Sequence, residues 1–390
     1  MIQTQYPVNA QEPITTVGQL RNHLCQAAAV ELSTVPLYLY AAYSIKTAGY
    51  SQWAPGMSAF RAIRSVVIEE MLHLCLARNL LVAIGGGRQL TFYDKSFIPT
   101  YPSPMLHRVP DLTLGLERCT PTLMQDVFMP LEMPAKAGDP AQPESYNTLG
   151  QFYDAIAEGF ERLSGPKLWR NPHVDLQYDE AYWNQDGGGV PIVVKDLASA
   201  LAAISTIVEQ GEGAAPGDDE VALKPATPQA GLEELSHYAK FRRIAEGIDE
   251  IGDTWPVASN PTREEYEGPV ADLATLFDAA YCYVLCIIDA VYTKSSKTRK
   301  PGKRSPRYGL ERTFIAAMGG LLYPIGDLLV RQPGPRRGQN AAPTFGYYAF
   351  DGAGSKKDEL IALCDAAVGD FPSLGGDDGV RQLISRMPEV

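Results

Sequence analysis

Apolar residues recur at helical spacing in two long segments near the N-terminus. Across residues 17–46, apolar side chains follow one another at steps of three and four, which is the period of one helix face. A second such segment covers residues 57–84 and ends at three consecutive glycines, a common stop signal for a helix. We therefore predict two long helices that pack antiparallel. Pro36 lies inside the first and should kink it.

Five further segments have helical periodicity, and proline-rich or glycine-rich stretches separate them. We predict these helices over residues 148–163, 196–209, 232–248, 270–292 and 310–329. Residues 88–147 contain many prolines and lack a period, so we expect no long regular element there. The acidic stretch 212–230 and residues 332–352 should be loops. This order of elements predicts a mostly α fold.

The 390 residues have a composition that favours a soluble globular protein, with 45% hydrophobic and 21% charged side chains. A net charge of −12 disfavours nucleic acid and anionic membrane surfaces as partners. The N-terminus does not have the pattern of a signal peptide, and the most apolar run, 279–288, is shorter than the roughly 20 residues of a membrane span. We expect a cytoplasmic protein whose six cysteines are reduced and pack in the core.

A repeated Glu-x-x-His motif is the main chemical signal. Only five histidines occur, and two of them close this motif: Glu70 with His73, and Glu234 with His237. Both motifs lie in predicted helices, where residues three apart share a face and can bind one ion together. A single motif of this kind is more often a surface pair, but two in one chain favour a metal site.

Each Glu-x-x-His helix follows a helix that carries a glutamate among apolar residues, Glu31 in the first case and Glu209 in the second. The resulting order, Glu, Glu-x-x-His, Glu, Glu-x-x-His, is the ligand set of the di-iron and di-manganese carboxylate four-helix bundles. Four carboxylates offset the charge of two divalent ions, and one imidazole per metal leaves room for oxygen. We therefore predict a ferritin-like four-helix bundle with a long irregular crossover over residues 88–195.

The domain division follows from this assignment. Residues 1–250 should form the dimetal bundle with its crossover, and residues 251–390 a helical C-terminal extension packed on it. Several alternatives stay open for the ligands. Glu31 could instead satisfy the backbone near Pro36, and Glu69 or Glu233 could bind after a one-residue shift. Three other glutamates are rival sources for the carboxylate of the third helix: Glu212, Glu158 and Glu161.

Two tyrosines are candidate catalytic residues. Tyr38 lies seven residues after Glu31, on the same helix face, and Tyr238 adjoins His237. A phenol beside an oxidising dimetal centre can donate a hydrogen bond or an electron, although packing in the core is the commoner role of tyrosine. The other histidines, His23, His107 and His173, are expected to be structural or exposed.

Four segments, AVELSTVPLYLYAAYSIK, IEEMLHLCLARNLLVAIGG, IVEQGEG and ELSHYAKF, resemble the ferritin-like domain of the iminophenylpyruvate dimer synthase family. This family includes violacein- and rebeccamycin-type enzymes that couple two amino-acid-derived imines oxidatively. The resemblance covers residues 15–250 and implies a metal-dependent oxidation of a small, amino-acid-derived substrate in a biosynthetic pathway. It also implies six metal ligands: Glu31, Glu70, His73, Glu209, Glu234 and His237.

We therefore expect a non-haem oxidoreductase with two iron ions, with manganese or a mixed pair as alternatives, and with O₂ as co-substrate. An external electron donor is a further candidate partner. The main alternative function is metal binding or storage of the ferritin type without an organic substrate. A monomer or homodimer in solution would count against a storage shell.

Overall fold

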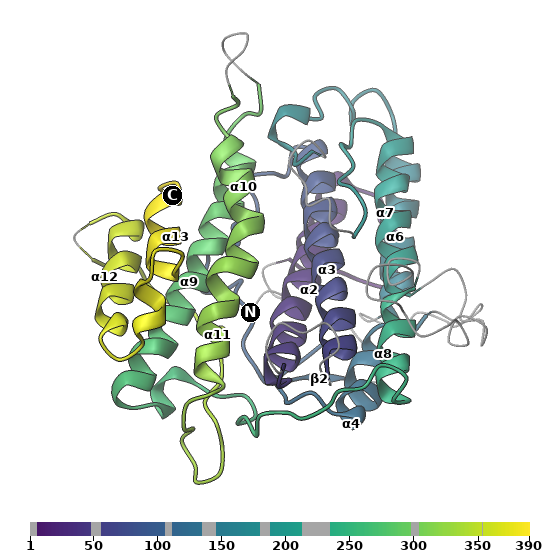
Figure 1. Ribbon diagram of the computed structural model, residues 1–390. Helices are drawn as coiled ribbons and strands as arrows, with labels where there is room; N and C mark the ends of the chain where they lie inside the picture. The colour runs from purple at the N-terminus through teal and green to yellow at the C-terminus, as the bar shows by residue number, and fades with distance from the viewer. Residues whose placement is uncertain are drawn as a thin grey trace.

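The computed structural model describes residues 6–47, 56–105, 111–134, 146–179, 188–212, 235–297, 304–352 and 354–390. Helices dominate these ranges, so the predicted mostly α class is confirmed (Figure 1). The longer helices are α2 (Val17–Ser44), α3 (Met57–Ala83), α6 (Leu149–Leu163), α7 (Leu197–Gly211), α8 (His237–Ala245), α9 (Gly268–Thr293), α10 (Tyr308–Ala317), α11 (Tyr323–Leu329), α12 (Lys356–Val368) and α13 (Val380–Arg386).

Helices α2 and α3 form the predicted hairpin and agree with the sequence pattern to within two residues. α2 begins at a capping box in which Thr16 and Gln19 exchange hydrogen bonds, and it continues through Pro36. The hairpin lies between α6 and α7 on one side and α9 to α11 on the other (Figure 1). Most residues of α2 are therefore buried on every face, as expected for a helix in the centre of a large core.

The bundle around the hairpin differs from the prediction in one helix. α6 packs against α2 and α7, although it was predicted to belong to the crossover. The helix predicted over residues 232–248 is shorter: α8 begins at His237, where Ser236 is the N-cap and accepts a hydrogen bond of 3.2 Å from the Ala239 amide. The predicted N-terminus of this helix is wrong, because the chain has non-helical dihedrals at Ser236.

The crossover contains one helical run that the sequence analysis did not predict. α4 (Pro121–Leu123), the π-helical turn η1 (Met124–Phe128) and α5 (Met129–Leu131) follow each other without a break. Thr120 caps the run, and the wide π turn precedes Pro130, which has no amide hydrogen to donate. The remaining short elements are β1 (Ser103–Pro104), β2 (Thr113–Leu114), η2 (Val174–Leu176), η5 (Arg263–Glu265), η6 (Met318–Leu322) and η7 (Pro372–Gly375).

The two short strands pair antiparallel, with Ser103 opposite Leu114. Among the described helices, α9 alone is long and apolar enough to cross a membrane, but 83% of its most apolar window is buried inside the protein. It is the central helix of the C-terminal part, and its burial agrees with the prediction that the apolar run 279–288 lies in a buried helix. Its last turn joins the hairpin through a hydrogen bond of 3.3 Å from the Tyr292 hydroxyl to the Cys75 carbonyl.

Candidate metal centre

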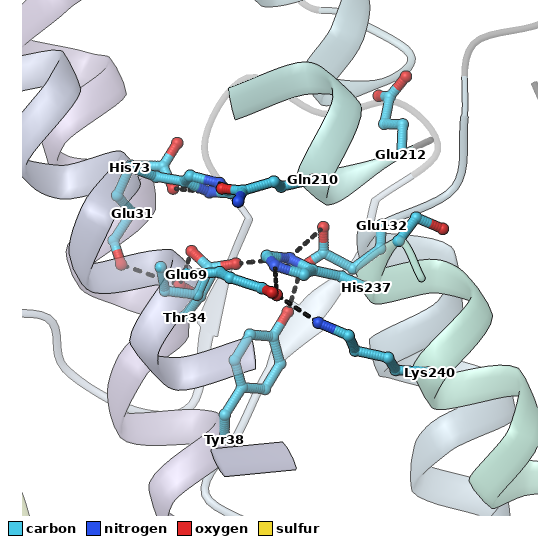
Figure 2. Close-up of polar contacts among 12 residues, drawn as sticks. Glu31, Thr34, Tyr38, Glu69, His73, Glu132, Gln210, Glu212, His237 and Lys240 are labelled. Carbon is cyan, nitrogen blue, oxygen red and sulfur yellow. Dashed lines mark hydrogen bonds and ion pairs between the residues drawn. The ribbon is translucent and has the colours of Figure 1, made fainter. Parts of the chain in front are cut away.

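Acidic and imidazole side chains from five segments meet in the interior beside α2 and α3 (Figure 2). All of them are buried, so their charges need compensation from one another or from a bound cation. α2, α3 and α8 supply predicted ligands, whereas two glutamates come from the crossover and from the end of α7. The six residues are Glu31, Glu70, His73, Glu132, Glu212 and His237. Ligand atoms of Glu70, His73 and His237 lie within 4.8 Å of one another.

His73 lies between α2 and α7. Its Nδ1 is 3.5 Å from Glu31 Oε2, and its Nε2 is 3.0 Å from Gln210 Oε1. Glu31 is held from the other side by the Tyr153 hydroxyl of α6, which donates a hydrogen bond to Glu31 Oε1. One nitrogen of the imidazole therefore faces the carboxylates, and the other faces an amide at the edge of the bundle (Figure 2).

His237 lies between two consecutive glutamates of α3. Its Nε2 is 3.0 Å from Glu69 Oε2, and its Nδ1 is 3.0 Å from Glu70 Oε1 and 3.6 Å from Glu132 Oε2. Neither ring nitrogen makes an aligned hydrogen bond with a described residue, although both are fully buried. The two histidine rings stack with their centroids 5.3 Å apart.

Glu132 is a site residue that the sequence analysis missed. It follows α5 directly, is 2% exposed, and accepts a hydrogen bond from the Tyr38 hydroxyl. The prolines of the crossover concealed the helix that carries it. A signal was present, since Thr120 followed by Pro121 is a typical helix start and apolar residues then recur up to Leu131.

The structure does not bring Glu209 into the site. Its side chain is exposed and accepts a hydrogen bond from Ser205 on the same helix, because Glu209 lies two residues from the buried Ile207 and so faces away from the bundle. Glu212, the rival candidate at the C-cap of α7, lines the cavity instead. Figure 2 shows its carboxylate directed away from His237. The Gly150 amide, at the start of α6, donates a hydrogen bond to this carboxylate.

The other candidates have different outcomes. Glu158 and Glu161 of α6 are exposed and do not reach the site. Glu233, Glu234 and His107 lie outside the described residues. Tyr38 is buried beside the site, whereas Tyr238 is only partly buried and has no described hydrogen bond to the six site residues.

Burial and neighbouring charges shift the pKa of the acids in opposite directions. Burial raises the pKa of Glu70 to about 7, and the negative charges of Glu31 and Glu132 add to this effect against the contact with His237. Burial acts the same way on Glu31, but the hydrogen bond and charge of His73 outweigh it and lower the pKa of Glu31.

The imidazoles respond to the same carboxylates. Burial disfavours the charged form of His237, but the surrounding glutamates raise its pKa well above the ordinary value, with Glu132 the largest contributor. At His73, burial lowers the pKa, but the hydrogen bond and the charge of Glu31 outweigh burial and raise the pKa above its ordinary value. Without a metal, protons on these groups compensate the buried carboxylates, and bound cations would replace those protons.

The chemistry of these residues fits divalent metal ions. Glu31, Glu70, His73, Glu132 and Glu212 line a cavity of about 20 Å³, which holds a water-sized species, and its remaining wall is made by α6 and α7. His237 contacts two of these carboxylates, Glu70 and Glu132. Carboxylate oxygens and imidazole nitrogens are donors for first-row transition metals. The Nδ1 of His237 is a buried polar atom without an aligned hydrogen bond to a described residue, as expected where a metal bond takes the place of one.

Comparison with known proteins identifies the family. A family model described as ferritin-like matches residues 24–246, which is more than half of the chain. The chain belongs to the ferritin-like family. The predicted ferritin-like fold is thus confirmed. The crystal structure of a ferritin-like protein from Caulobacter vibrioides also has this fold, with a TM-score of 0.52, 21% identity, and coverage of 81% of this chain and 98% of that one.

Two curated relatives share sequence with most of this ferritin-like chain. Dichlorochromopyrrolate synthase of Lentzea aerocolonigenes is 28% identical over 394 residues, which cover 85% of this chain and 36% of the relative. The 2-imino-3-(indol-3-yl)propanoate dimerase of Chromobacterium violaceum is 26% identical over 374 residues, covering 85% and 34%. The chain spans about a third of the length of these relatives. They confirm the resemblance drawn from the sequence segments.

Proposed function

We propose that this ferritin-like protein is a non-haem dimetal oxidoreductase, with two iron ions, that uses O₂ to oxidise a small amino-acid-derived substrate in specialised metabolism. The observation that supports it best is the arrangement of His73 and His237, whose Nδ1 atoms face buried carboxylates that line one cavity. The curated relatives support the substrate class, since one is named for an imino acid that it dimerises.

In this proposal Glu31, Glu70, His73, Glu212 and His237 hold the ions, with Glu132 as a further carboxylate donor and Glu234 kept as a predicted ligand. When bound, the metal pair supplies the redox chemistry by passing electrons to O₂. The carboxylates balance the positive charge of the ions. Tyr153 and Tyr38 orient Glu31 and Glu132 through hydrogen bonds. Apolar side chains of α6 and α7 form the rest of the cavity wall.

Anaerobic loading with Fe(II), followed by measurement of O₂ uptake, tests the proposal. We expect two iron ions per chain. We also expect O₂ consumption above that of the amino-acid oxidase that generates an imino acid in situ from tryptophan or phenylalanine, and this extra consumption should depend on the imino acid. His73→Ala should abolish both, whereas Glu209→Gln, which changes an exposed residue of α7, should leave both unchanged.

Two results would contradict the proposal. Uptake of many iron ions per chain without substrate dependence, in a large shell, would favour ferritin-type storage. Turnover retained by His73→Ala would exclude the metal centre described above as the site of oxidation. A solution mass of a monomer or homodimer is expected.

A further inference from the structure

The two site histidines have chemically different partners at Nε2, the ring nitrogen opposite the Nδ1 that faces the cavity carboxylates. His73 Nε2 is 3.0 Å from the amide oxygen of Gln210, whereas His237 Nε2 is 3.0 Å from the carboxylate of Glu69. Such outer partners fix which nitrogen binds a metal and how strongly it donates. The difference between the amide partner of His73 and the carboxylate partner of His237 should therefore change how strongly each histidine binds its metal ion in the proposed centre.

The orientation of Gln210 determines the tautomer of His73. The amide nitrogen of Gln210 donates to the Gly188 carbonyl at 3.2 Å, so its oxygen is directed toward His73. An oxygen acceptor requires a hydrogen on His73 Nε2, so Nδ1, the nitrogen that faces Glu31, is the one that can give up its proton and bind a metal. His73 thus has one neutral outer partner, and that partner is itself only partly buried.

The outer partner of His237 is a buried ion pair. Glu69 Oε2 is 2.5 Å from Lys240 Nζ, and both side chains are at most 2% exposed. Glu69 does not line the cavity, in contrast to its neighbour Glu70. Lys240 therefore holds Glu69 on the Nε2 side of the imidazole (Figure 2). Glu70 is the carboxylate of this helix turn that lines the cavity.

We propose that Glu69, anchored by Lys240, and Gln210 are positioning residues that make the two metal positions unequal, so that the ion at His237 binds more tightly than the ion at His73. This inference rests on the proposed dimetal centre. A carboxylate partner makes the opposite ring nitrogen a stronger donor than an amide partner does. In addition, His237 Nδ1 faces two carboxylates, Glu70 and Glu132, whereas His73 Nδ1 is paired with Glu31.

Anaerobic titration of the metal-free full chain with Co(II), followed by visible absorption, tests the inference without relying on activity. We expect two ions to bind in two resolved steps with dissociation constants that differ about tenfold or more. The double variant Glu69→Gln/Lys240→Met removes the buried pair without leaving an unpaired charge. It should weaken the tighter step by about 10- to 100-fold and leave the weaker step unchanged.

Two further variants complete the design. Gln210→Ala should weaken only the weaker step, and it keeps the inference testable if the double variant does not fold. Arg242→Met/Glu246→Gln removes a partly exposed ion pair of 2.8 Å on the same helix and should change neither step.

The outcomes separate this inference from the proposed function. A wild-type chain that binds no Co(II) contradicts the dimetal centre itself. Two ions bound with equal affinity, or a Glu69→Gln/Lys240→Met variant whose steps both stay unchanged or weaken equally, overturn only the roles of Glu69 and Gln210. So does a Gln210→Ala variant in which the tighter step is the one that weakens.

Discussion

Gly150 and Glu212 are in direct contact at the junction of α6 and α7. The Gly150 amide donates a hydrogen bond of 2.5 Å to Glu212 Oε1, and a Cβ at residue 150 would lie 2.9 Å from the carboxylate carbon. Because real Cβ atoms almost never come so close to another heavy atom, any larger residue at position 150 would displace Glu212. The start of α6, where a negative charge is favoured, thereby fixes a carboxylate at the edge of the cavity.

The substitution Gly150→Ala should destabilise the protein by about 1–3 kcal/mol, because it creates a clash and displaces a hydrogen-bonded carboxylate. Gly309→Ala is the matched control, since Gly309 is also the second residue of its helix but has open space around it. It should be neutral or stabilising by up to about 1 kcal/mol. Chemical denaturation of both variants measures the difference.

A double-mutant cycle isolates the contact. In a Glu212→Ala background, Gly150→Ala should no longer be destabilising, because the added methyl group meets no carboxylate. An equal loss of stability in both backgrounds would show that the Gly150–Glu212 contact is not the cause.

The sequence favours Glu209 as the carboxylate ligand from α7, whereas the structure favours Glu212. Metal binding can distinguish the two. Glu212→Gln keeps the size of the side chain but removes its charge, so we expect the affinity for one Co(II) ion to fall about tenfold or more. Glu209→Gln should bind both ions like the wild type, because Glu209 is exposed. A loss of affinity in Glu209→Gln alone would restore the original assignment from the sequence.

The helices with strong periodicity could be predicted because propensity, capping and burial agree along them. α2 and α3 are buried on almost every side, and their sequences are apolar on almost every face. The helical period of the sequence therefore suffices to place Glu31, Glu70 and His73 on these two helices. The choice between Glu209 and Glu212 as the third-helix carboxylate depends on one turn at the end of α7, where a shift of a few residues changes the face that a side chain occupies. The structure places Glu212 at the cavity and Glu209 on the exposed face.

Glu132 shows a different limit of sequence reasoning. No spacing rule connects it to Glu31 or His237, because only tertiary packing of the run 121–131 against α8 brings it to the site. The same holds for Gln210 and Glu69, whose importance depends on which nitrogen of a histidine they face. Side chains that support a ligand from another element leave no local pattern in the sequence.

Tyr153 should contribute to the metal site through Glu31, although it was not a sequence candidate. Tyr153→Phe removes the hydroxyl that donates to Glu31 Oε1 in a fully buried position. We expect a loss of about 1–2 kcal/mol in stability and a several-fold weaker binding of Co(II), because an outer partner of a ligand is lost. Tyr238→Phe is the control and should change neither property; equal effects of the two substitutions would contradict this role.

Asp278 should make the stability of the C-terminal part depend on pH. It lies in α9, where its Oδ1 accepts hydrogen bonds from the Thr344 hydroxyl at 2.6 Å and from the Gly346 amide at 2.9 Å. Burial raises its pKa from 3.8 to about 7, against the effects of these hydrogen bonds and of Arg263. The folded state therefore binds a proton more tightly than the unfolded state does, and this contribution to stability is lost as pH rises from about 4 to about 7.

A shift of this size corresponds to up to about 4 kcal/mol across that range. Asp278→Asn keeps the oxygen that accepts from Thr344 and Gly346 but cannot ionise, so its free energy of unfolding should fall less with pH than that of the wild type. Urea denaturation of both metal-free proteins between pH 5 and 8 measures the difference between their free energies of unfolding. The titration of the metal-site residues cancels in this difference, because both proteins contain the same metal-site residues. Parallel curves for the two proteins would mean that Asp278 has the same pKa in the folded and unfolded states.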